Sequence, residues 1–401
     1  MTITPFSPAL PGATLALGAA LPAAVAGLAS GEPIAIDAIR IGSLDGRLEH
    51  PFVIASDATK QTDVENVRVV VRTVDGNLGV GEAAPYKGIA GDTALAIRND
   101  LTLAIPNIWG RDMTPVKFFS TVNRYLKWPA ARAALETAYL DAQARTQGIS
   151  LLTYLNPEAK KRPLMTDITI PITGVAYAFE LARKYRNEGF TRIKVKVGDT
   201  VSDAVGRVGA VIAAFDEVRA GPRLELLLDA NEGYSSEKAI LLLWHLENRL
   251  GRSPVIFEQP VERNDIDGMR HVRAVAEGYG TRIFADESVF TVEDARRVIG
   301  AEAADGINLK PMKHGGLIES LRIAELASEA GLELMIGGMV ESRIAMTASL
   351  HLAQLIDTVW LDLDTPLLME VFGVTGGMIY DGANIMLSDA KGLGVDTGED
   401  L

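Results

Sequence analysis

The sequence predicts an α/β fold, a (β/α)7β barrel with an α+β capping domain built from the N-terminal region and the C-terminal tail. From about Asp167 onward, eight short apolar runs alternate with helical segments, a pattern typical of parallel βα units. The runs start 24 to 32 residues apart, enough for a strand, a helix and two loops. The chain has 401 residues, 48% of them hydrophobic, and single cores rarely exceed ~250–300 residues, so a second domain is expected.

Residues 1–33 are expected to form a flexible leader. Prolines at positions 5, 8, 11 and 22 would interrupt a helix there. No Lys or Arg precedes Arg40, so the charged region that opens an export signal is missing. We therefore expect a cytoplasmic protein, although the small residues at 26–30 leave export through the leader open.

Residues 34–160 are predicted to form the main part of the capping domain. The segments Ile34–Ile41 and Val64–Thr73 have the character of antiparallel strands. An apolar stripe with helical spacing predicts a helix over Ala130–Gln147.

Two loops and the C-terminal segment complete this domain. The polar segment Ser56–Asp63 and the Gly- and Pro-containing segment Gly81–Asp92 are predicted to be loops that cap the barrel and exclude water. The segment 367–401 contains no further βα unit and is expected to pack on the capping domain.

Residues 161–366 are predicted to form the barrel. Its strands are expected at the runs Ile168–Ile172, Arg192–Val197, Leu224–Leu228, Val255–Phe257, Arg282–Ala285, Gly306–Leu309, Glu333–Ile336 and Val359–Leu361. The C-terminal ends of barrel strands converge on one mouth, where active sites are built. Residues that follow these runs are therefore the candidates for chemistry.

Composition excludes several classes of function. Lys plus Arg total 39 against 52 Asp plus Glu, and the net charge of −13 would repel nucleic acid and anionic lipid. No uninterrupted apolar stretch reaches the ~20 residues of a membrane helix. The chain has no cysteine, which excludes disulfides and thiol catalysis. A small-molecule partner is expected, and a homo-oligomer is left open.

Three lysines stand at predicted strand ends. Lys194 and Lys196 face the same side of the second strand, because side chains alternate along a strand. Their apolar neighbours then face the helices, so both ammonium groups project into the barrel mouth, where Lys310 ends the sixth strand. Lys194 and Lys196 are each expected to lower the other's pKa, which would bring a lysine closer to acting as a base near neutral pH.

Three carboxylates follow successive strands. Asp229, Glu258 and Asp286 end the third, fourth and fifth strands and offer an oxygen-only site, which suits Mg²⁺, one ion per subunit. A single acidic residue in such a place is more often a helix N-cap, and a single lysine is usually on the surface. The shared position of the whole set favours an active site over that structural explanation.

At these residues the sequence resembles the enolase superfamily, in its muconate lactonizing enzyme subgroup, from about residue 34 onward. The subgroup pattern of Lys-x-Lys, then Asp, Glu and Asp on the next three strands, then Lys on the sixth, is complete here. Within the subgroup the sequence is most similar to dipeptide epimerases such as L-Ala-D/L-Glu epimerase. The similarity lies in the stretches Ala285–Phe290, Asn308–Gly316, Gly338–Arg343, Thr347–His351 and Leu361–Leu368.

The resemblance implies Mg²⁺-dependent epimerisation of a dipeptide at the α-carbon of its C-terminal residue. It implies a 1,1-proton transfer through an enediolate, with Lys196 and Lys310 acting on opposite faces of that carbon. Asp362 and Asp364 would hold the α-ammonium group of the substrate, because two carboxylates on one face of a strand form an anionic clamp. Lys194 would lie beside the substrate carboxylate.

Two further residues are substrate-binding candidates by the same resemblance. Lys60 is a candidate partner for an anionic substrate side chain. Glu341 is expected near the mouth in a supporting role.

Other activities fit part of the pattern. An N-acylamino-acid racemase, an o-succinylbenzoate synthase or a muconate-type cycloisomerase would keep the lysines and the carboxylate triad. Their substrates carry no free ammonium group for Asp362 and Asp364. A barrel that binds a ligand without turnover is a more remote alternative.

Overall fold

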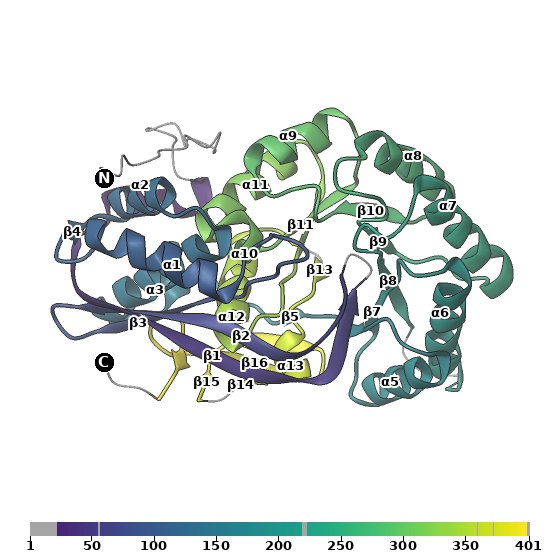
Figure 1. The fold of residues 1–401 in the computed structure, drawn as a ribbon, viewed down its shortest axis with the longest axis horizontal. Coiled ribbons are helices and arrows are strands. Elements are labelled where there is room, and N and C mark those ends of the chain that lie inside the picture. Colours follow the sequence, from purple (N-terminus) through teal and green to yellow (C-terminus); the bar gives the residue numbers. More distant parts are fainter. Residues whose placement is uncertain (1–21, 55–56, 219–222, 359, 372, 399–401) are drawn as a thin grey trace, which may run out of the picture.

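The computed structural model describes residues 22–54, 57–218, 223–358, 360–371 and 373–398, without the side chains of residues 51–61. Figure 1 shows two parts, one built around the N-terminal strands and helices and the other a ring of strands surrounded by helices. The predicted combination of a capping domain and an α/β barrel is confirmed.

An antiparallel sheet forms the centre of the capping domain. Its strands follow the order β14-β1-β2-β3, and β4 pairs with β1. Alternate residues of β2, among them Val67, Val69 and Val71, are fully buried, as strand periodicity requires. The strand bounds are β1 Ile34–Ile54, β2 Asp57–Thr73, β3 Leu78–Ala83, β4 Asp112–Met113 and β14 Met369–Val371.

The prediction of a loop over Ser56–Asp63 is wrong for most of that segment. Residues from Asp57 onward belong to β2, and Asp63 and Gln61 pair with Arg47 and Phe52 of β1. The resulting long hairpin reaches from the capping domain toward the barrel (Figure 1). Thr62 and Asp63 are exposed, so this part of the strand lacks the apolar alternation by which strands are recognised in a sequence.

Helix α3, Pro129–Thr146, lies directly on strand β3 and confirms the predicted helix. Gly79 and Gly81 allow this contact, since an added Cβ would be 2.0 Å from the Ala138 carbonyl oxygen and 1.9 Å from that of Ala134. The other helices of this domain are η1 Ala23–Ser30, α1 Ala94–Ala104, η2 Ile105–Asn107, α2 Pro115–Tyr125 and α4 Leu151–Leu155.

Eight parallel strands form the barrel sheet, in the order β13-β12-β11-β10-β9-β8-β7-β6. The first and last strands are joined where the Asp167 N–H donates to the Leu361 carbonyl at 2.9 Å. The bounds are β6 Ile168–Ile170, β7 Arg192–Lys196, β8 Glu225–Asp229, β9 Ile256–Glu258, β10 Arg282–Ala285, β11 Gly306–Leu309, β12 Glu333–Ile336 and β13 Trp360–Leu361. All eight predicted runs contain a strand.

Helices follow the barrel strands and cover the outside of the sheet (Figure 1). They are α5 Val175–Asn187, α6 Val201–Asp216, α7 Ser236–His245, η3 Leu246–Leu250, α8 Ile266–Ala276, η4 Glu277–Tyr279, α9 Val292–Gly300, α10 Pro311–His314, α11 Leu317–Glu329, α12 Arg343–Leu355 and α13 Thr365–Leu368. In the described part of the chain, no helix combines the length and apolar character needed to cross a bilayer.

Segments near both ends of the described part of the chain contribute to the packing. β14 of the C-terminal segment pairs with β1, and the Leu393 N–H donates to the Asp141 carboxylate of α3 at 2.6 Å. The remaining short strands are β5 Leu164–Met165, β15 Thr375–Gly376, β16 Met378–Asp381, β17 Asn384–Leu387 and β18 Val395–Asp396. Within the expected leader, η1 buries Val25 and Leu28, whereas residues 1–21 lie outside the described part.

Side chains of the capping domain also hold barrel loops in place. The buried Glu82 carboxylate of β3 accepts hydrogen bonds from the Ser342 N–H and the Ser342 hydroxyl, at 2.8 and 2.6 Å. The buried Glu136 carboxylate of α3 accepts the N–H groups of Leu317 and Ile318, which begin helix α11. These contacts satisfy donors that have no partner within their own helix.

Candidate active site

The strand register gathers the predicted residues at one end of the barrel. Lys196 of β7 pairs in register with Asp229 of β8, which pairs with Glu258 of β9. Asp286 follows β10 directly. Asp229, Glu258 and Asp286 are each at most 1% exposed, so the structure brings the three predicted carboxylates into one buried cluster.

Lysines form short ion pairs with these carboxylates. The Lys196 Nζ lies 2.6 Å from the Asp229 carboxylate, and the Lys310 Nζ lies 2.6 Å from that of Asp286. The Lys194 Nζ contacts Glu258 at 2.7 Å and Asp229 at 3.3 Å. Lys194 and Lys196 therefore project to the same side of β7, as strand alternation predicts.

Lys196 and Lys310 approach the site from opposite sides of the barrel. Lys196 ends β7 and Lys310 follows β11, with three strands between them in the sheet of eight. Both side chains line the same pocket. A substrate carbon held between them would present one face to each amine.

This pocket lies between the barrel mouth and the capping domain. It holds about 800 Å³ of empty space, its open mouth included. The capping domain contributes Leu48 and His50 from β1, and Tyr86 and Ile89 from the loop after β3. Two residues of the predicted loop Gly81–Asp92 thus line the pocket, whereas its first three residues belong to β3 and are not a loop. The charged residues of the barrel that line the pocket are Lys196, Lys310, Asp362 and Asp364.

Asp362 and Asp364 form a second acidic group with Asp167. Among the described residues, carboxylate oxygens of these three buried side chains all lie within 4.8 Å of one another. The Lys194 Nζ donates to Asp362 at 2.7 Å, and the Thr169 N–H donates to Asp364 at 2.6 Å. The predicted Asp-x-Asp pair is therefore held together, with Lys194 between it and the carboxylate triad.

The predicted lowering of the Lys194 pKa is wrong. Burial disfavours the charged amine, but the carboxylates of Asp362, Glu258 and Asp229 outweigh burial and hold the pKa of Lys194 well above its usual value. The pKa of Lys310 is raised in the same way, against the effect of burial, chiefly by Asp286. The acidic groups that each lysine contacts therefore outweigh the repulsion between neighbouring lysines.

The lysines compensate the carboxylates unequally. Against the effect of burial, Lys196 and Lys194 lower the pKa of Asp229 to about 2, and Lys310 and Lys313 hold the pKa of Asp286 well below its usual value. Glu258 and the neighbouring Glu287 are not fully compensated. Burial, followed by repulsion from Asp229, raises the pKa of Glu258 to about 7. Burial, followed by repulsion from Asp286, raises the pKa of Glu287 to about 8. A divalent cation among these oxygen donors would supply the missing positive charge, so the triad fits Mg²⁺ by its charge and its ligand type.

The two acidic groups differ in their suitability for a metal. The oxygens of Asp167, Asp362 and Asp364 lie closer together, whereas the oxygens of the triad contact lysines. The triad could hold a metal, because its members come from three successive strand ends, and its contacts to lysine would then be exchanged for contacts to the ion. Asp362 and Asp364 line the pocket and are available to a cationic group of a substrate.

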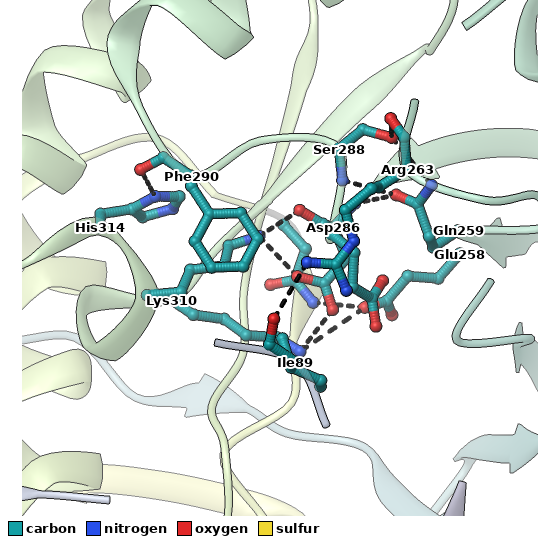
Figure 2. Close-up of polar contacts among 12 residues, drawn as sticks. Ile89, Glu258, Gln259, Arg263, Asp286, Ser288, Phe290, Lys310 and His314 are labelled. Carbon is teal, nitrogen blue, oxygen red and sulfur yellow. Dashed lines mark hydrogen bonds and ion pairs between the residues drawn. The ribbon is translucent and has the colours of Figure 1, made fainter. Parts of the chain in front are cut away.

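Several supporting residues were missed by the sequence analysis. The Asn308 side chain donates to Glu258 at 2.7 Å, and the buried Lys313 Nζ lies 2.5 Å from Asp286. Figure 2 shows the Gln259 side chain reaching the Asp286 loop, where it accepts the N–H groups of Asp286 and Ser288. Asn308 could have been found, since it shares a strand face with Lys310, but no strand or helix periodicity marks Gln259 or Lys313.

The two other predicted substrate-binding residues, Glu341 and Lys60, are not among the described residues that line the pocket. Glu341 is fully buried and does not line the pocket; its carboxylate accepts the Met339 N–H at 2.7 Å. Lys60 lies in β2, in the segment whose side chains are outside the described part.

Comparisons with known proteins identify the family of both parts of the chain. Residues 38–155 match the family model "Mandelate racemase / muconate lactonizing enzyme, N-terminal domain", and residues 177–401 match "Enolase C-terminal domain-like". The chain is 37% identical to an L-Ala-D/L-amino acid epimerase of Populus trichocarpa, over 90% of this chain and 85% of that protein. It is 34% identical to a hydrophobic dipeptide epimerase of Citrifermentans bemidjiense, over 87% and 94% of the two chains.

A solved structure shows the same similarity in three dimensions. The dipeptide epimerase from Enterococcus faecalis V583, complexed with Mg and the dipeptide L-Leu-L-Tyr, superimposes with a TM-score of 0.82 at 29% identity, covering 90% of this chain and all of that one. The chain belongs to the mandelate racemase/muconate lactonizing enzyme family of the enolase superfamily.

Proposed function

We propose that this protein is a Mg²⁺-dependent dipeptide epimerase that inverts the α-carbon of the C-terminal residue by 1,1-proton transfer. One observation carries the proposal. Lys196 and Lys310, from opposite sides of the barrel, line one pocket together with the carboxylates of Asp362 and Asp364. Relatives named as dipeptide epimerases, and the complex of one of them with Mg and a dipeptide, support it.

The two lysines divide the proton transfer between them. Lys196 removes the α-proton from one face of the carbon, which leaves an enediolate, and Lys310 returns a proton to the other face. The opposite stereoisomer reverses these roles. Mg²⁺ bound by Asp229, Glu258 and Asp286 would supply Lewis-acid stabilisation of the negative charge that develops on the substrate carboxylate.

Lys310 must lose its proton before it can act as a base. The Asp286 carboxylate that keeps the pKa of Lys310 high against burial is one of the proposed metal ligands. A cation held by Asp286 would weaken the attraction of this carboxylate for the Lys310 ammonium. Metal binding and deprotonation of Lys310 would therefore favour each other.

The remaining charged residues position the substrate. Asp362 and Asp364 bind its α-ammonium group, and Lys194, which contacts Asp362 and Glu258, lies between the ammonium site and the metal site. There Lys194 neighbours the substrate carboxylate. Glu341 fixes the pocket wall through the Met339 N–H.

A dipeptide library in D₂O tests the function. The full-length protein with Mg²⁺ should incorporate one deuterium at the α-carbon of the C-terminal residue and convert that residue to its other stereoisomer, as followed by mass spectrometry and chiral chromatography. Exchange with N-acylated amino acids alone would favour the N-acylamino-acid racemase instead. Absence of exchange with both compound classes would contradict the proposed function.

A further inference from the structure

Among the described residues that line the pocket, each charged side chain is assigned to a group that every dipeptide has, the α-carbon or the α-ammonium group. Lys196 and Lys310 are assigned to the α-carbon, and Asp362 and Asp364 to the α-ammonium group. Every other described lining residue is apolar or carries a polar group that is neutral in its usual form, with the exception of His50.

His50 is held by Tyr177 through one ring nitrogen, whereas its buried Nε2 has no hydrogen-bond partner among the described residues. Its Nδ1 lies 2.8 Å from the Tyr177 hydroxyl, and its ring packs edge-on against the Tyr177 ring. Its Nε2 lies 3.7 Å from the Glu49 carboxylate, which also accepts a hydrogen bond from Lys184 at 3.1 Å. The Glu49 charge would oppose an anionic substrate side chain at this position.

One half of the pocket surrounds the ammonium site. Leu368 ends the short helix that begins directly after Asp364, and Leu48 pairs in register with the next residue, Met369. Pro171 lies two residues after Thr169, whose N–H binds the Asp364 carboxylate. The side chain of the substrate's N-terminal residue would therefore lie among Leu48, Pro171 and Leu368, all of which line the pocket.

The other half lies beside Lys310. Tyr86 and Ile89 belong to the capping loop, and the Ile89 carbonyl accepts a hydrogen bond from Arg263 at 2.9 Å, which fixes the loop over the strand ends (Figure 2). Met339 follows β12, the strand adjacent to β11 and Lys310. The side chain of the substrate's C-terminal residue would lie among these three side chains, of which Ile89 and Met339 are apolar and Tyr86 presents a neutral aromatic ring.

Two cationic residues near the capping loop, Arg263 and Lys87, do not line the pocket. Arg263 makes a two-point ion pair with Glu232, at 2.8 and 2.5 Å, in addition to its bond with Ile89. Lys87 lies between Tyr86 and Ile89 but is exposed and does not line the pocket.

We propose that the substrates of this enzyme are dipeptides with apolar side chains at both positions, bound in two apolar halves of one pocket. This inference rests on the proposed function. A glutamate side chain in the half formed by Tyr86, Ile89 and Met339 would lose its hydration and find no described cation beside it except Lys310, which pairs with Asp286 and is assigned to the α-carbon. That cost falls on binding. A large apolar side chain in the same place buries its surface favourably.

The test compares L-Ala-L-Phe, L-Leu-L-Phe and L-Ala-L-Glu with the full-length protein and Mg²⁺, by α-deuterium incorporation in D₂O. The kcat/KM of the first two should exceed that of L-Ala-L-Glu by roughly 10²-fold. Ile89→Arg, which places a cation in the wall beside Lys310, should raise the ratio of L-Ala-L-Glu to L-Ala-L-Phe by at least about tenfold. Lys87→Ala is the matched control in the same loop, and the ratio should stay unchanged.

A second readout is independent of turnover. L-Ala-L-Phe should raise the melting temperature of the Mg²⁺-loaded protein more than L-Ala-L-Glu at equal concentration. If L-Ala-L-Glu binds and turns over better than L-Ala-L-Phe, the inference is overturned and the epimerase function stays intact. Loss of that preference in Lys60→Ala would then identify Lys60 as the partner of the substrate's glutamate side chain. If no dipeptide exchanges its α-proton, the proposed function fails, and this inference fails with it.

Discussion

Replacing Asp364 by asparagine tests the ammonium site with little disturbance of the fold. The Asp364 carboxylate is 1% exposed and accepts the Thr169 N–H at 2.6 Å. The amide oxygen of asparagine can accept the same hydrogen bond, so Asp364→Asn removes the charge and keeps the contact.

The magnitude follows from the surroundings of Asp364. Breaking a buried ion pair typically costs ~3–5 kcal/mol. The lower end applies, because Asp362 still carries a charge in the variant and because burial, followed by repulsion from Asp362, already raises the pKa of Asp364 to about 7. At ~1.4 kcal/mol per decade, kcat/KM for a free dipeptide should fall by roughly 10²-fold.

The assay compares α-deuterium exchange of L-Ala-L-Phe with that of N-acetyl-L-Phe. The acetylated compound lacks the ammonium group, so Asp364→Asn should leave its turnover unchanged or improve it. Asp267→Asn, an exposed substitution on α8, serves as the matched control. An equal loss on both substrates would refute the ammonium assignment, as would a wild-type preference for the acetylated compound that survives the substitution.

Three further predictions concern the metal, the capping domain and pH. Removing divalent metal with a chelator should stop turnover and added Mg²⁺ should restore it, whereas Asp286→Asn should weaken Mg²⁺ binding measured by calorimetry; activity that survives chelation would contradict the mechanism. Gly81→Val should destabilise the protein by ~1–3 kcal/mol or more in urea unfolding, since its Cβ would meet the Ala134 carbonyl of α3, and an unchanged midpoint would refute that contact. Burial raises the pKa of Glu136 from 4.5 to about 8 despite two N–H donors, so its contribution to stability is present below pH 4.5 and is lost as pH rises toward 8, with a slope of at most ~1.4 kcal/mol per pH unit. Glu136→Gln should flatten the dependence of unfolding free energy on pH in this window, and an unaltered dependence would exclude Glu136 as its source.

The barrel strands could be predicted because each has an apolar run of its own and a spacing that only a βα unit fills. The β1–β2 hairpin could not, since Thr62 and Asp63 are exposed and the two strands pair there through backbone hydrogen bonds, which leave no apolar pattern in the sequence. Its consequence for the site was missed as well, because Leu48 and His50, which line the pocket, belong to the part of β1 beyond the predicted strand.

The positions of the active-site residues were easier to predict from the sequence than the pKa values of those residues. Strand alternation and the shared mouth placed Lys194, Lys196 and Asp229 together, as the ion pairs among them show. The pKa of Lys194 depends on Asp362 and Glu258, which are far away in sequence. Glu258 lies two strands away in the sheet, and Asp362 meets Lys194 through the closure of the barrel. Local patterns carry no information on such contacts.

The proton transfer by two lysines is the central claim, and deuterium incorporation by Lys196→Ala and Lys310→Ala tests it most directly. Each variant is incubated in D₂O with Mg²⁺ and with one pure stereoisomer of the best dipeptide at a time. We predict that neither variant epimerises, and that each exchanges the α-proton only in the stereoisomer that faces its remaining lysine, so that the two variants act on opposite isomers. Epimerisation at the wild-type rate in either variant, or exchange of the same isomer by both, would contradict the assignment of Lys196 and Lys310 to opposite faces.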